Sequence, residues 1–119
     1  MFLQLAHTKL EIFQTTKRLV LEVYKLSKNL PQEERFALTQ QIRRAAISVH
    51  LNVAEGFSRK SPAERKRFLE VSRGSLIELD TALDISIELL YLEGVNLKEV
   101  SWLIISCFSQ LSKLIKSLS

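Results

Sequence analysis

The stretch that decides the fold is "QQIRRAAISVHLNVAEGFSRKSPAERKRF", residues 40–68. Its first half has helical periodicity and few residues that would break a helix. It is interrupted at Gly56, and Ser61-Pro62-Ala63-Glu64 then has the form of a capping box with Pro at the first helical position. A glycine commonly follows the last residue of a helix, where a left-handed conformation is needed. The stretch therefore predicts two helices joined by a short loop, the first ending at residue 55 and the second starting at residue 62.

Similar signals for the start and the end of a helix divide the rest of the chain. Pro31 marks one helix start, Gly94 follows a helix end, and Asn96-Leu97-Lys98-Glu99 is a second capping box. No stretch alternates polar and apolar residues with the period of two that a strand requires. We therefore expect helices over residues 3–29, 31–55, 62–93 and 97–118. Short connections force neighbouring helices to run antiparallel, so residues 1–119 are predicted to form one all-α domain, an up-down-up-down four-helix bundle.

The last predicted helix has the most regular apolar face. Its residues follow alternating spacings of three and four, as in the seam of a coiled coil. The predicted seam consists of Leu97, Val100, Ile104, Cys107, Leu111, Leu114 and Leu118.

Composition limits the class of protein. The chain has 119 residues, 46% hydrophobic and 25% charged, and one cysteine, Cys107, which suits a reducing compartment. No apolar run approaches the ~18 residues of a membrane span, and the first residues lack the pattern of a signal peptide. We expect a cytoplasmic protein without a membrane partner.

No motif of catalysis or cofactor binding is present in the sequence. His7 and His50 have no partner at metal-ligand spacing, and "GFSRKS" lacks the glycines of a phosphate-binding loop. The sequence therefore predicts a protein that is not an enzyme and that holds no metal or cofactor.

The predicted helix over residues 31–55 has three faces instead of two. One apolar stripe is wide enough for the bundle core, and a second apolar stripe consists of Phe36, Ile47, Leu51 and Ala54. Since a monomeric bundle needs only one buried stripe per helix, we interpret the second as an interface in a homo-oligomer.

A polar stripe separates the two apolar ones and contains Arg44, Asn52 and Glu55. A glutamate at the C-terminal end of a helix is disfavoured by the helix dipole, so Glu55 should have a cationic or amide partner. We interpret the three residues as a buried structural lock. The alternatives are a ligand-binding site and an acid–base centre, for which a lone glutamate is weak evidence.

The net charge of +4 is concentrated at one end of the predicted bundle. That end carries three acidic residues, Glu11, Glu55 and Glu64, against eight basic ones: Lys9, Arg59, Lys60, Arg65, Lys66, Arg67, Lys113 and Lys116. The opposite end carries four basic and five acidic residues: Lys25, Lys28, Arg35 and Lys98 with Glu33, Glu34, Glu88, Glu93 and Glu99.

Cations around "SRKSPAERKR" would contact phosphates without reading bases. The candidate nucleic-acid-binding residues are Arg59, Lys60, Arg65, Lys66 and Arg67. The alternative interpretation is a solvated basic loop that serves solubility.

Residues 31–79 contain a specific motif. It maps onto Pro31, Glu34, Leu38, Gln41, Ile42, Arg43, Arg44, Ala45, Ser48, Val49, Asn52, Val53, Ala54, Glu55 and Gly56, followed by Gly74, Ser75, Leu76, Glu78 and Leu79. This pattern resembles the four-helix-bundle proteins encoded within intervening sequences of bacterial 23S ribosomal RNA genes. Arg73 departs from the family, which often has alanine there.

The resemblance implies a non-enzymatic bundle that assembles as a ring, a homopentamer, and binds RNA or DNA. Similar bundles are the accessory variability determinants of diversity-generating retroelements, which partner a reverse transcriptase and bind nucleic acid. The resemblance thus leaves two functions open. One is a nucleic-acid-binding oligomer, and the other is an adaptor for a protein such as a reverse transcriptase.

Overall fold

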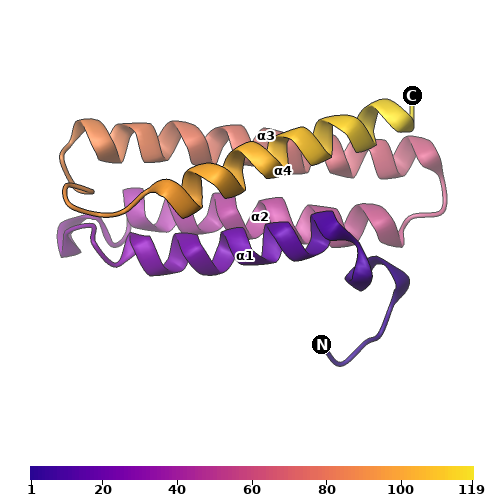
Figure 1. The fold of residues 1–119 in the computed structure, drawn as a ribbon, viewed down its shortest axis with the longest axis horizontal. Helices are drawn as coiled ribbons and strands as arrows, with labels where there is room; N and C mark the ends of the chain where they lie inside the picture. Colours follow the sequence, from indigo (N-terminus) through magenta and orange to yellow (C-terminus); the bar gives the residue numbers. More distant parts are fainter.

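The computed structural model describes residues 1–119 and contains four α-helices that run antiparallel to their neighbours along the chain (Figure 1). They are α1 (Glu11–Ser27), α2 (Leu38–Ser58), α3 (Pro62–Glu88) and α4 (Lys98–Ser117). Helices α1 and α2 form one layer and α3 and α4 the other, in a molecule of 43 × 30 × 25 Å. The predicted all-α bundle with up-down-up-down topology is confirmed. None of the helices combines the length and the apolarity needed to cross a bilayer.

The core lies between the two layers and takes one face of each helix. Helix α4 departs from its predicted seam, because Leu103 and Ile115 are buried while Ile104 and Leu114 are only partly buried. Its fully buried residues follow spacings of three, four, four and four, so the buried stripe drifts around the helix. A drifting stripe is what a helix presents when it crosses its neighbours at an angle, and α4 does cross α3 obliquely (Figure 1).

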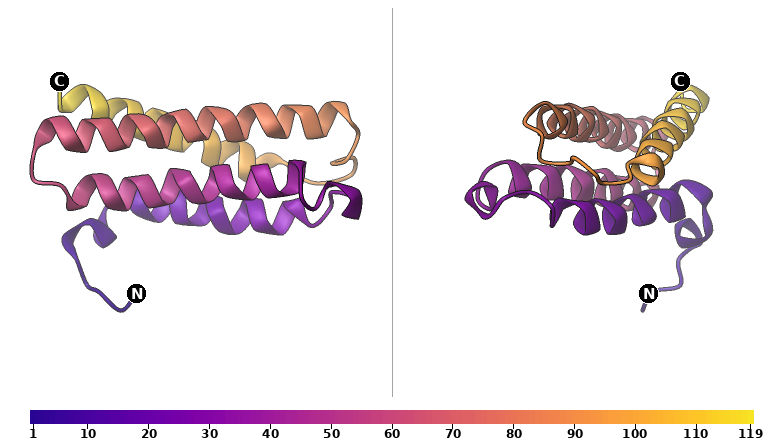
Figure 2. Two further views of the ribbon diagram at one scale, coloured as in Figure 1. Left: turned by 180° about the vertical axis from the view of Figure 1, so that it is seen from behind. Right: turned by 60° about the vertical axis from the view of Figure 1, so that its left-hand side comes forward.

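The first two helices begin later than predicted. Residues 1–5 lie outside the bundle, a 3₁₀ turn covers Ala6–Lys9, and α1 begins at Glu11. This segment leaves the layer of α1 and α2 on the side away from α3 and α4 (Figure 2). Pro31 precedes a second 3₁₀ turn, Gln32–Glu34, and α2 begins at Leu38. The Glu34 carboxylate fixes that turn by accepting hydrogen bonds from the Leu38 N–H at 3.4 Å and from the Tyr91 hydroxyl at 2.9 Å.

The predicted ends of α2 and α3 are also corrected. Helix α2 continues through Gly56 to Ser58, so this glycine does not cap the helix. A Cβ at Gly56 would lie 3.2 Å from the Phe68 Cβ, and the glycine instead allows α2 and α3 to approach closely. Helix α3 ends at Glu88, five residues before its predicted end, where Leu90 adopts a positive φ of 65°.

Candidate nucleic-acid interface

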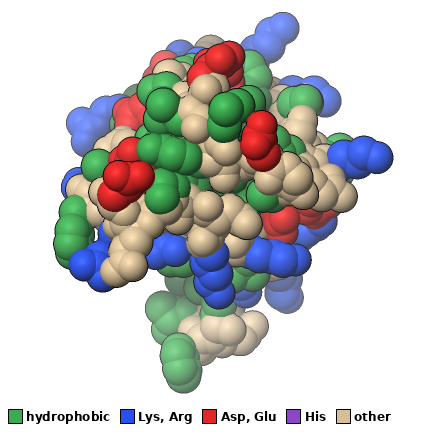
Figure 3. Space-filling model, turned by 90° about the vertical axis from the view of Figure 1, so that its left-hand side faces the viewer, with side chains coloured by type: hydrophobic (Ala, Val, Ile, Leu, Met, Phe, Trp, Pro, Cys, Tyr) green, Lys and Arg blue, Asp and Glu red, His purple; other side chains and the backbone are tan.

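The topology brings the predicted basic residues to one end of the bundle. The start of α1, the connection between α2 and α3, and the end of α4 meet there, at the right of Figure 1. Figure 3 looks onto the opposite end, where acidic and basic side chains are interspersed around hydrophobic ones. The residues that the sequence predicts for the basic end therefore do lie together at one end of the observed bundle.

The connection between α2 and α3 consists of only three residues, Arg59 to Ser61, and side chains hold it in place. The Ser61 hydroxyl accepts a hydrogen bond from the Glu64 N–H at 3.3 Å, which confirms the predicted cap of α3. The Arg65 Nε donates to the Arg59 carbonyl oxygen at 2.6 Å. Arg59 itself forms an ion pair with Glu55, one turn earlier. Two of the five candidate cations, Arg59 and Arg65, thus stabilise the loop.

Phe68 lies beside two of the candidate cations, Arg59 and Arg67. Its ring is half-buried and has the Arg59 guanidinium at 4.9 Å and the Arg67 guanidinium at 5.3 Å from its centroid. Both distances are within the range of cation–π attraction. The ring therefore packs against two of the five candidate cations and does not offer a free face for base stacking.

The remaining three candidate residues are available for a ligand. Lys60 and Arg67 are exposed and Lys66 is half-buried, and none of the three forms an ion pair or a hydrogen bond through its side chain. We call Lys60, Lys66 and Arg67 the free cation cluster.

The predicted lock of Arg44, Asn52 and Glu55 does not exist within the chain. Arg44 and Glu55 are exposed, and the cationic partner of Glu55 is Arg59. Asn52 instead donates to the Ser48 carbonyl oxygen at 2.8 Å and to the Ser48 hydroxyl at 3.1 Å. Arg44 precedes Asn52 by eight residues, about 12 Å along α2, and Glu55 pairs with Arg59 one turn further on, so the three side chains do not form one cluster.

Serines supply the polar contacts between α2 and α3 that the sequence did not reveal. The Ser48 and Ser75 hydroxyls are 2.7 Å apart, and the Ser72 hydroxyl donates to the buried Val49 carbonyl oxygen at 2.7 Å. The only sequence signal was the presence of small residues on the buried face of α3.

His50, which has no partner at metal-ligand spacing in the sequence, lies half-buried against α1. Its Nδ1 is 2.7 Å from the Thr16 hydroxyl, and its ring centroid is 4.5 Å from that of Phe13. Burial, with smaller contributions from Lys17 and His7, lowers the pKa of His50 below its usual value. Cys107 lies in the core as expected, where burial raises the pKa of its thiol to about 12.

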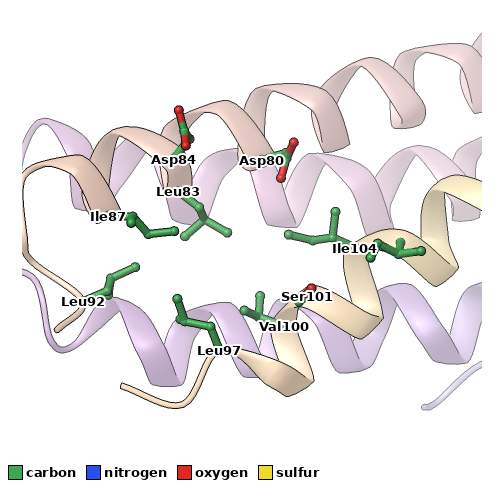
Figure 4. Close-up of a pocket in the computed structure, with 10 residues that line it drawn as sticks. Asp80, Leu83, Asp84, Ile87, Leu92, Leu97, Val100, Ser101 and Ile104 are labelled. Atoms are coloured by element: carbon green, nitrogen blue, oxygen red, sulfur yellow. The ribbon is translucent and has the colours of Figure 1, made fainter. Parts of the chain in front are cut away.

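Three residues of the predicted oligomer interface lie on α2, and the fourth, Phe36, lies in the turn just before it. Phe36 and Leu51 are exposed, and Ile47 and Ala54 are half-buried. The sequence did not predict a further apolar surface on α3 and α4, where Ile77, Ile105 and Phe108 are exposed. A groove of about 320 Å³ lies beside these residues, between the second half of α3 and the first half of α4 (Figure 4).

Comparisons with known proteins agree on the fold. The family described as 23S rRNA-intervening sequence protein matches residues 8–116 of the chain. A solved structure from Bacteroides thetaiotaomicron, a protein of unknown function from the S23 ribosomal protein family, is similar with a TM-score of 0.62. The two chains are 19% identical, and the similarity covers 90% of this chain and 94% of the other. No curated protein sequence matches this chain.

Proposed function

The chain belongs to the family of 23S rRNA-intervening sequence proteins, and from this premise we propose that it is a non-enzymatic, nucleic-acid-binding homo-oligomer. The proposed assembly is a pentameric ring, and the proposed ligand is structured RNA, or else DNA, bound with little sequence specificity. The observation that carries the proposal is the free cation cluster, Lys60, Lys66 and Arg67, which lies in and just after a three-residue connection that side chains hold in place.

The chemistry of the cluster favours phosphates over bases. Lysine and arginine side chains bind phosphate oxygens and release counterions, which gives affinity without sequence information. The ring of Phe68 already has two arginine guanidiniums near it, so stacking on bases contributes little.

Self-association would allow such a small cluster to bind nucleic acid with useful affinity. Leu51 on α2 and Phe36 in the turn before it expose apolar surface, which supports burial against another copy. Five copies around a ring would present five clusters on one side, and linked weak contacts raise the overall affinity by about 10²–10⁴-fold.

The test compares two triple variants with the same change of charge. Lys60→Ala/Lys66→Ala/Arg67→Ala removes the free cation cluster, and Lys25→Ala/Lys28→Ala/Lys98→Ala removes three exposed cations from the opposite end. We expect the first variant to bind an RNA hairpin at least about tenfold more weakly at low salt. Its affinity should also depend less on salt, with a log–log slope that is shallower by roughly 0.7–0.9 for each phosphate that the variant no longer neutralises.

The control variant should bind the RNA hairpin like the unaltered protein. Equal weakening by both variants would mean that net charge, and not the cluster, determines binding. Light scattering on each variant checks the assembly, which should have five times the 13.7 kDa mass of the chain. The same hairpin made of DNA tests the choice between the two nucleic acids.

A second candidate function is an adaptor for a protein, such as the reverse transcriptase of a diversity-generating retroelement. The exposed indole of Trp102 supports it, since exposed tryptophans are enriched where proteins meet. An adaptor would remain associated with the reverse transcriptase after nuclease treatment and would lose it in the Trp102→Ala variant. Loss of the complex on nuclease treatment would favour the first function. A gene for such an enzyme beside this one would be the starting point of the experiment.

A further inference from the structure

The groove between α3 and α4 is apolar inside and acidic on one side. Leu83 and Ile87 of α3 point into it toward Leu97, Val100 and Ile104 of the facing segment (Figure 4). An adjoining hollow of about 260 Å³, which shares Ile104 and Ile105 with the groove, extends it along the two helices. Seven of the ten residues that line the groove are hydrophobic, so it suits an apolar occupant.

Two carboxylates, those of Asp80 and Asp84, line the α3 side of the groove (Figure 4). Neither is part of either ion pair in the chain. An occupant that brings apolar side chains together with a positive charge would therefore match this surface better than a purely apolar one.

The chain itself contains an exposed apolar segment that is followed, four residues later, by a lysine. Residues 1–5, "MFLQL", are exposed, and Phe2, Leu3 and Leu5 expose large hydrophobic side chains outside the bundle. The first ten residues contain no Asp or Glu, and they include Lys9. The segment is thus apolar with a basic residue behind it, and the groove is apolar with two acidic residues beside it.

The segment cannot reach the groove of its own chain. It is anchored at the end of the bundle where α1 starts, because the His7 ring packs edge-on against Phe13 at 5.3 Å. From that point five extended residues span about 17 Å. Asp80 lies eighteen residues after Pro62 on α3, and at 1.5 Å per residue this places the groove about 27 Å from the same end. The segment also leaves the bundle on the side away from α3 and α4 (Figure 2).

We propose that residues 1–5 of one copy occupy the groove between α3 and α4 of a second copy. This inference rests on the proposed self-association and names one contact between neighbouring copies in addition to the predicted interface on α2. The contact is heterologous, because one copy contributes the segment and the next contributes the groove, and a heterologous contact that closes on itself produces a ring.

A disulfide experiment tests the contact directly. Phe2→Cys and Ile105→Cys are prepared as separate variants, one with an affinity tag that changes its size, and are mixed under mild oxidation. Ile105 lines both the groove and the hollow and is 67% exposed, so its substitution should not disturb the fold. The native Cys107 is buried and does not interfere. We expect a disulfide-linked pair of one tagged and one untagged chain, which neither variant forms alone in comparable yield.

Each other outcome overturns the inference in a recognisable way. A link within one chain, in a variant that carries both cysteines, would mean that the segment covers its own groove. Absence of a link in an assembly that light scattering shows to be intact would remove the inference and leave the proposed function standing. If the unaltered protein were monomeric, both this inference and the proposed function would be wrong.

A second set of variants avoids oxidation. Leu3→Asp and Ile105→Asp each place a charge in the proposed contact, and Val71→Asp places one at an exposed apolar position of α3 outside the groove. We expect the concentration at which the assembly dissociates to rise at least about tenfold in the first two variants and to stay unchanged in the third. Equal behaviour of all three variants would contradict the proposal.

Discussion

Gly56 and Gly74 lie inside α2 and α3, and they differ in what a side chain would meet. A Cβ at Gly56 would contact Phe68 and the Arg65 carbonyl oxygen at 3.2 and 3.4 Å, whereas a Cβ at Gly74 would meet nothing within 4 Å. In both helices alanine restricts the unfolded chain and favours the helix. Alanine variants at the two glycines therefore separate the effect of helix propensity on stability from the effect of packing between the helices.

We expect Gly74→Ala to raise the free energy of unfolding by about 0.5–1 kcal/mol. Gly56→Ala gains the same propensity but must move α2 away from α3, at a cost of about 1–3 kcal/mol, so its net effect should be a loss of about 1 kcal/mol. Urea denaturation of both variants measures the difference. If Gly56→Ala were as stabilising as Gly74→Ala, the close approach of the two helices would not constrain this position.

At the residue scale the sequence predicted local chemistry well and partners between helices poorly. The cap of α3 by Ser61 was predicted because it depends on residues within one turn. The cationic partner expected for Glu55 is also local, since Arg59 lies four residues further on. The hydrogen bond between Ser48 and Ser75 was not predicted, because it depends on how α3 is rotated relative to α2. A helical wheel gives directions around one axis and no distances to the next helix.

At the scale of elements, the end of α3 is the clearest departure from the sequence prediction. The Tyr91 N–H donates to the Ser86 carbonyl oxygen at 3.0 Å, and the Leu90 N–H donates to that of Ile87 at 2.9 Å. This is the Schellman arrangement, whose left-handed position usually holds glycine. Here it holds Leu90, so the sequence shows no signal for the end of the helix.

Replacement of Leu90 by glycine should stabilise the protein. A non-glycine residue in the left-handed region costs about 1–2 kcal/mol, and the greater freedom of glycine in the unfolded chain offsets about half of that. Leu90 is 65% exposed, so little apolar surface is uncovered by the change. We expect a net gain of about 0.5–1 kcal/mol in the free energy of unfolding, measured by urea denaturation.

The control for this prediction is Gly94→Ala in the same connection. Gly94 has a φ of +76°, so alanine there should destabilise the protein by about 1 kcal/mol. The two variants should change the free energy of unfolding in opposite directions. A destabilised Leu90→Gly variant would show that the leucine side chain stabilises the fold more than its backbone conformation costs.

At the scale of the whole molecule, the proposed function depends on assembly as well as on charge. Leu51 lies on the predicted oligomer face of α2, is 59% exposed and precedes Lys60 by nine residues. We expect Leu51→Asp to dissociate the ring and to weaken RNA binding by at least about tenfold, because single clusters lose the benefit of effective concentration. Light scattering and RNA titration on the same sample provide the measurement.

Leu21→Asp is the matched control, since Leu21 is a comparably exposed leucine on α1 outside the predicted interface. It should leave both mass and affinity unchanged. Circular dichroism should show the same helix content in both variants. If Leu51→Asp abolished the assembly and kept the affinity, each chain would bind RNA independently.

The overall architecture was predictable because breakers divide the chain into four segments and short connections allow only one simple topology. The sign of the charge at each end followed from that topology. The exposed apolar surface of α3 and α4 was not predictable in the same way. It exists because α4 crosses α3 obliquely, which leaves Ile77, Ile105 and Phe108 uncovered, and the crossing angle is set by packing rather than by any local motif.

The unequal connections at the two ends restrict how the gene can change in length. Residues 59–61 are tied by a cap and by a guanidinium, so an insertion there would scatter the cations that surround them. Residues 89–97 form a nine-residue connection at the opposite end, and extra codons at its exposed Glu93-Gly94 would lengthen a loop while the Tyr91 hydrogen bond and the buried Leu92 stay in place. Family members of different size should therefore diverge at that loop, and an engineered fusion is best inserted there.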